Sequence, residues 1–167
     1  MTINSLGPEP GVETIDTGID DFSTEQLADV LSDALADSFT LYLKTLGVHW
    51  NIVGPAFYGI HKLTQDQYED LDAAIDEIAE RIRALGHVAP AAFGDFQQRS
   101  MLQSKTTLSD AKQMLETLIE DNETVARRMR DAVRIADEFD DVFTADMLTA
   151  RIGRHERNSW MLRASVA

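Results

Sequence analysis

Apolar residues recur at every third or fourth position over four long stretches of the chain, and no other feature of the sequence limits the fold as strongly. This spacing is typical of amphipathic helices, and no stretch shows the strict alternation of apolar and polar residues that half-buried strands display. We expect helices from 23 to 48 or 50, from 56 to 85, from about 107 to 138, and from 141 or 144 to 162. The sequence therefore predicts an all-α protein built as a four-helix bundle.

Short local signals set the expected helix ends. Residues 23–26, Ser-Thr-Glu-Gln, have the form of a capping box at the start of the first helix. The Gly-Pro pair at 54–55 and Gly86 end the first two helices. The last break is marked only by two adjacent aspartates at 140–141.

The chain divides into an acidic, largely irregular tail over 1–22, a bundle over 23–163 and a short C-terminal tail over 164–167. Residues 86–106 form a long connection, in which a short extra helix is expected near 96–102. Bundles of this type often place metal sites between facing helices.

The composition excludes several classes of protein. The 167 residues contain no cysteine, which rules out disulfide scaffolds, thiol catalysis and iron–sulfur clusters. A net charge of −14 disfavours nonspecific binding to nucleic acid, which needs a basic surface. Few Lys among many acids suit a chain from a salt-adapted organism, although an ordinary acidic protein is the alternative. Because neither a membrane span nor a signal peptide is evident, we expect a soluble cytoplasmic protein with no membrane partner.

The second helix carries a polar stripe directly beside its apolar face. At 100° per residue, six side chains fall within about 100° of one another: His61, Gln65, Glu69, Asp72, Asp76 and Glu80. His49 lies just across the Gly-Pro turn. Imidazole and carboxylate ligands suit iron, manganese or zinc, so the stripe is a candidate metal site, with a solvated acidic face as the alternative.

Helix geometry limits which of these residues can share a metal ion. His61 and Asp76 are separated by about 22 Å along one straight helix, at 1.5 Å per residue, whereas metal–ligand bonds are about 2 Å long. A second copy of the helix, packed antiparallel about a two-fold axis, can bring His61 opposite Asp76 and Gln65 opposite Asp72. The stripe can therefore form a dimer interface with a metal site at each end.

The motif around these residues is distinctive. Residues 49–57 read HWNIVGPAF, and they are followed by His61 and by residues 70–81, DLDAAIDEIAER. This pattern resembles the Dps family of mini-ferritins over about residues 24–163. The resemblance implies a ferritin-like four-helix subunit, a hollow homododecamer, and ferroxidase centres shared across two-fold dimer interfaces.

The resemblance also implies roles for individual residues. His49 and His61 of one chain, with Asp76 and Glu80 of its partner, would bind two irons per centre. Trp50 would pass electrons beside the centre, whereas its alternative interpretation is a core aromatic at a helix end. The implied activity is oxidation of Fe²⁺, preferably by hydrogen peroxide, with storage of Fe³⁺ oxide inside the shell, which protects DNA and the cell from oxidative damage.

Two residues depart from the family pattern. Gln65 stands where the family usually has an aspartate, so we expect a weaker ligand there. Lys62 stands where the family often has an acid that is thought to nucleate mineral. Glu69 and Asp72 are therefore our candidates for nucleation.

Other acidic residues resemble the region through which iron enters family members. Asp140, Asp141 and Asp146 are candidates for such a pore, although acids at a helix start also complement the helix dipole. His155 with Glu156 is expected to be an exposed pair rather than a transport site. Family members that bind DNA typically use Lys-rich tails, and this N-terminal tail has no basic residue, so no direct DNA binding is expected.

Two other functions are alternatives for an acidic helical bundle of this kind. A larger ferritin is disfavoured because those bundles carry Glu-x-x-His motifs, and no histidine here has a glutamate three residues before it. A non-enzymatic helical assembly protein, whose acidic stripe only sets the dimer register, stays open as the alternative.

Overall fold

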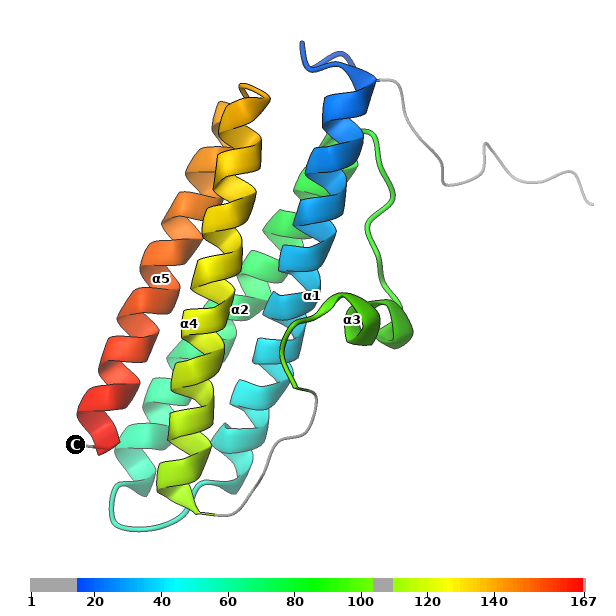
Figure 1. Cartoon of the computed structure of the whole chain (residues 1–167). Coiled ribbons are helices and arrows are strands. Elements are labelled where there is room, and N and C mark those ends of the chain that lie inside the picture. Colours follow the sequence, from blue (N-terminus) through cyan, green and yellow to red (C-terminus); the bar gives the residue numbers. More distant parts are fainter. Residues whose placement is uncertain (1–14, 104–109, 167) are drawn as a thin grey trace, which may run out of the picture.

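The computed structural model describes residues 15–103 and 110–166. Figure 1 shows four long helices side by side as a bundle, with one short helix outside it next to the first. The described residues contain no strand, and their helices are α1 (Asp21–Asn51), α2 (Phe57–Ala84), α3 (Phe93–Arg99), α4 (Ala111–Glu138) and α5 (Val142–Val166). The predicted all-α fold, with an extra helix between the second and third long helices, is confirmed. Most of the acidic tail and the expected start of the third long helix lie outside the described residues.

The first helix begins earlier than the capping box predicted, so that prediction is wrong. Asp20 is the N-cap: its carboxylate accepts hydrogen bonds from the Ser23 backbone N–H at 3.1 Å and from the Ser23 hydroxyl at 2.7 Å. These hydrogen bonds lower the pKa of Asp20 below its ordinary value. An aspartate three residues before Ser23 satisfies the free backbone donors of the first turn, and Ser23 itself becomes helical.

As predicted, the helical conformation is interrupted at Asp140 and Asp141, between α4 and α5. Asp140 has a φ of 56°, a left-handed conformation that Asp tolerates better than most residues. The Asp141 backbone N–H then donates to the Ala136 carbonyl at 2.9 Å, which closes α4. Gly86, with a φ of 88°, ends α2 in the same manner, because the next N–H donates back to the Ile82 carbonyl.

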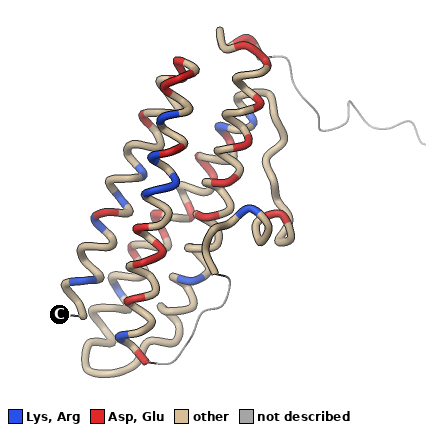
Figure 2. Tube along the Cα trace, in the orientation of Figure 1, with Lys and Arg blue, Asp and Glu red and all other residues tan. Residues whose placement is uncertain are grey.

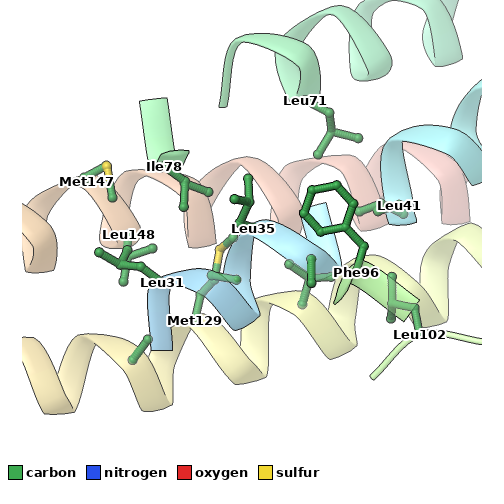
Figure 3. Close-up of a cluster of buried hydrophobic side chains, with 14 of the residues drawn as sticks. Leu31, Leu35, Leu41, Leu71, Ile78, Phe96, Leu102, Met129, Met147 and Leu148 are labelled. Atoms are coloured by element: carbon green, nitrogen blue, oxygen red, sulfur yellow. The ribbon is translucent and has the colours of Figure 1, made fainter. Parts of the chain in front are cut away.

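The core lies along the axis of the bundle, where leucine, isoleucine and methionine side chains from the long helices and Phe96 from α3 meet (Figure 3). Most of the apolar residues expected on the inner faces of the first three long helices are buried there. The apolar spacing of the last long helix predicts Phe143 and Trp160 on its inner face, but in α5 they are 60% and 67% exposed. The inner face of α5 instead includes polar residues: Thr144, Arg151, His155 and Ser159.

Ion pairs link neighbouring helices of the bundle. In Figure 2 most of the basic positions lie on α4 and α5, whereas the charged positions of α1 are mostly acidic. Asp37 of α1 is fully buried, pairs with Arg128 of α4 at 3.1 Å, and accepts hydrogen bonds from Ser100 and the Met101 N–H just after α3. This carboxylate therefore ties three helices together.

Among the described residues, no helix combines the length and apolar character of a bilayer span.

Each long helix carries buried polar residues, among them Thr45, Gln67, Asn122 and His155. His155 Nδ1 lies 3.0 Å from Asn122 Oδ1, while His155 Nε2 and both polar atoms of the Gln67 amide have no hydrogen-bond partner among the described residues. Burial, reinforced by the charge of Arg151, lowers the pKa of His155 from 6.5 to about 3. His155 is thus a neutral residue of the core, and the expected exposed pair with Glu156 is wrong.

Acid should destabilise the fold through His155. Below pH 6.5 the unfolded chain binds a proton at this residue that the folded chain does not take up until about pH 3. Stability is therefore complete above pH 6.5 and falls by about 2–3 kcal/mol between pH 6.5 and 4.5 from this residue alone. Urea unfolding of the wild type and His155→Gln at several pH values measures the difference, with His87→Gln as the control. Parallel pH profiles for the wild type and His155→Gln would contradict the prediction.

Candidate metal centre

His49 and His61 face each other across the turn between α1 and α2. Their rings stack with centroids 3.7 Å apart and planes 18° from parallel. Each ring is held by the other residue's backbone, since Nδ1 of His49 lies 2.9 Å from the His61 carbonyl oxygen and Nδ1 of His61 lies 2.9 Å from the His49 carbonyl oxygen. The turn at 52–56 makes this reciprocal pairing possible.

These hydrogen bonds place a proton on Nδ1 of both rings. A carbonyl oxygen only accepts, so each Nδ1 donates. In the neutral form of such a ring Nε2 keeps its lone pair, which is the form in which imidazole binds a metal ion. The structure thus holds two candidate nitrogen ligands side by side.

Neighbouring side chains hold the two rings from the sides. The Tyr68 ring meets His49 edge-on at 5.1 Å, and Phe57 stacks on His61 at 5.1 Å. Thr64 lies in the apolar stripe of α2, and its hydroxyl oxygen is 3.4 Å from His49 Nδ1. The helical spacing predicts Thr64 only as part of the core stripe, although a polar residue within an apolar stripe, one turn after a histidine, is a signal for contact with the histidine pair.

Trp50 follows His49 at the end of α1 and is 68% exposed. The interpretation of Trp50 as a core aromatic is therefore wrong for the single chain. Its exposure leaves the indole free to meet another molecule beside the histidine pair.

The carboxylates of the stripe do not reach the histidines within one chain. Asp76 and Glu80 are exposed on α2, and no group of three or more His, Asp or Glu side chains in the described part of the chain is close enough to hold a metal ion. Gln65 lies closer to His61, but its amide oxygen accepts a hydrogen bond from Lys62 at 2.9 Å and its nitrogen donates to Glu69 at 2.8 Å. Asp72 is exposed. One chain therefore brings together only the two histidines of the predicted ligand set.

The three aspartates of the candidate pore differ from one another. Asp141 is buried, and its carboxylate accepts two hydrogen bonds from Arg81, at 2.7 and 2.8 Å, as well as one from the Thr144 N–H. Burial raises the pKa of Asp141, but these hydrogen bonds outweigh it and the net shift is downward. Asp140 and Asp146 are exposed, so they are the two that can meet an entering cation.

Comparisons with known proteins agree with this architecture. Residues 28–167 match the family model described as a ferritin-like domain. An uncharacterised low temperature-induced protein of Nostoc is 38% identical over 91% of this chain and 86% of its own length. The DNA protection during starvation protein 2 of Bacillus anthracis is 32% identical over 84% of this chain and 96% of its own length. The crystal structure of a Vibrio cholerae Dps protein, described as a member of the ferritin-like diiron-carboxylate proteins, has a TM-score of 0.86 at 28% identity, covering 93% of this chain and 98% of that one.

The protonation of the histidine pair can be tested directly. In protein with ¹⁵N-labelled histidine, we expect both His49 and His61 to carry the proton on Nδ1. Addition of Zn²⁺, which does not react with oxygen, should shift both Nε2 signals strongly and leave His155 unchanged, because its Nε2 is buried. A proton on Nε2 of either His49 or His61 would contradict the proposed ligand state.

Proposed function

The chain belongs to the Dps family of ferritin-like proteins, and from this we propose that it is a ferroxidase that takes Fe²⁺ as its substrate and stores the ferric product. The observation that carries the proposal is the stacked pair of His49 and His61, whose Nδ1 atoms are both held by carbonyl oxygens, with no third His, Asp or Glu of the described residues grouped beside them. A second chain is our proposed source of the remaining ligands.

The second half of the centre comes from the acidic end of α2. In an antiparallel pair of α2 helices with its two-fold axis between Tyr68 and Glu69, His61 faces the partner's Asp76, and the partner's Glu80 follows one turn later. Two imidazoles and two carboxylates then surround each end of the pair. This nitrogen and oxygen donor set suits Fe²⁺, and its two negative charges balance one divalent cation.

Each molecule of hydrogen peroxide accepts two electrons in the proposed reaction. Two Fe²⁺ ions give up one electron each, the O–O bond of hydrogen peroxide breaks, and with two water molecules the products are two FeOOH units and four protons. The bound carboxylates stabilise the ferric state as it forms. The resemblance gives Trp50, which is exposed and directly follows His49, the role of passing an electron between the centre and its surroundings.

Storage requires a closed volume, and the family resemblance supports a hollow homododecamer for this chain. Asp140 and Asp146 are the candidates for iron entry. Glu69 and Asp72 are the candidates for mineral nucleation, and Glu69 is held in place by the Gln65 amide. In such an assembly the two-fold interfaces carry the oxidation and the interior holds the product.

Anaerobic titration with Fe²⁺, followed by hydrogen peroxide, tests the activity. The wild type should consume half an equivalent of peroxide per iron, and Asp76→Ala/Glu80→Ala should lose the rapid oxidation. The control is Asp66→Ala/Glu77→Ala, which removes the same charge from exposed positions away from the stripe.

Mixing of inactive variants tests whether the centre is shared. His61→Ala and Asp76→Ala should each be inactive alone, because each removes one ligand from every centre. Refolded together, they should regain part of the activity, because mixed pairs contain one centre with all four ligands. Activity in Asp76→Ala/Glu80→Ala equal to that of the wild type would leave the stripe with a role in assembly only, which is the alternative function.

Protection of DNA should be chemical rather than by contact. The N-terminal tail has no basic residue and the chain carries −14, so phosphate repels the protein. We expect no shift of duplex DNA in a gel at low salt and pH 7, together with less strand cleavage when Fe²⁺ and peroxide are added in the presence of protein. A saturable complex under these conditions would overturn this prediction.

A further inference from the structure

Lys62 lies beside the candidate centre and organises the side chains that follow it. It comes directly after His61, and its Nζ donates to Gln65 Oε1 at 2.9 Å. The Gln65 Nε2 in turn donates to Glu69 Oε1 at 2.8 Å. Lys62 and two residues of the stripe, Gln65 and Glu69, thus form one hydrogen-bonded chain that begins at the lysine next to His61.

This chain of hydrogen bonds removes a ligand from the centre. Gln65 lies one turn after His61 on the same face of α2, so its side chain is the nearest further donor that the histidine-bearing chain can offer. Its oxygen faces the Lys62 ammonium instead. Turning that oxygen toward a metal ion would break the bond to Lys62 and leave two positive charges close together.

The charges of the shared centre favour a single metal ion. The two imidazoles are neutral, and the partner's Asp76 and Glu80 contribute two negative charges, which one divalent cation balances. A second cation would meet the first one and the Lys62 ammonium. The carboxylates left beside Gln65 are Glu69, which already accepts a hydrogen bond from the Gln65 amide, and the partner's Asp72. In the antiparallel pair, Lys62 also lies opposite Ile75 of the partner subunit, directly beside the partner's Asp76.

We propose that Lys62 is a specificity-determining residue of the shared centre: its ammonium group and the Gln65 amide that it holds take the place of a second metal ion, so that each centre binds one divalent cation tightly. The inference rests on the proposed function. The two-electron reduction of peroxide requires a second Fe²⁺, which then binds to the centre weakly and only transiently. The family resemblance implies a pair of irons per centre, and Lys62 and Gln65 change that number in this chain.

Titration of the metal-free wild-type protein with Zn²⁺, followed by calorimetry, counts the tight sites without any oxidation. We expect one tight Zn²⁺ per chain in the wild type. In Lys62→Met the amide oxygen is released and the positive charge is lost, so a second Zn²⁺ should bind about tenfold more tightly or better. Gln65→Asp should have the same effect, because it adds a carboxylate at the same place.

The matched control is Lys112→Met, which removes the same charge from an exposed lysine beside Glu116 on α4. It should leave the titration unchanged, since it lies away from the stripe. An equal effect of Lys112→Met would mean that the overall charge, and not Lys62, sets the number of ions, and the inference would fall.

Other outcomes separate this inference from the proposed function. Two tight Zn²⁺ per chain in the wild type, or one in both the wild type and Lys62→Met, would overturn the role of Lys62 while leaving the centre intact. Zn²⁺ binding that does not change in Asp76→Ala would overturn the shared centre itself.

Discussion

The antiparallel register of α1 and α2 is the constraint on which the candidate centre depends. Tyr42 of α1 contacts Tyr68 of α2, and near the other end Thr24 of α1 contacts His87, which lies just after α2. These contacts lock the helices along their length, so the turn at 52–56 must return the chain with His49 and His61 level. The rings then stack, and each finds the other's carbonyl within hydrogen-bond distance. The orientation of the ligand nitrogens is therefore a consequence of helix packing.

The same rigidity keeps the carboxylates away from the histidines of their own chain. An α-helix rises about 1.5 Å per residue and does not fold back, so Asp76 stays far from His61 whatever the side chains do. A metal centre with these ligands can form only between chains, which makes assembly a condition of the proposed activity.

The sequence was sufficient for the features that depend on backbone conformation and on spacing. Gly86 and the break at 140–141 ended helices where expected, and the four long helices follow the apolar periodicity. It was insufficient where polar side chains are buried. Periodicity counted Phe143 and Trp160 as core, whereas the inner face of α5 is completed by His155, whose burial depends on its partner Asn122 on α4. Such pairings between distant segments leave no local pattern.

The candidate site shows the same division. His49 and His61 could be singled out from their spacing, but the proton position on their rings depends on a pair of carbonyl contacts that only the folded hairpin creates. The burial of Asp141 likewise follows from Arg81, 60 residues earlier in the chain. The contact of Thr64 with His49 and the hydrogen bond from Lys62 to Gln65 could be identified only in the folded structure.

Both tryptophans of the chain are exposed, Trp50 at 68% and Trp160 at 67%, and they belong to the last two turns of α1 and α5, which end at the same end of the bundle (Figure 1). An indole in water emits at longer wavelengths than one in an apolar contact. The isolated subunit should therefore fluoresce like an unfolded chain although it is fully helical, and a shift of its emission to the blue would report contact with other subunits rather than folding.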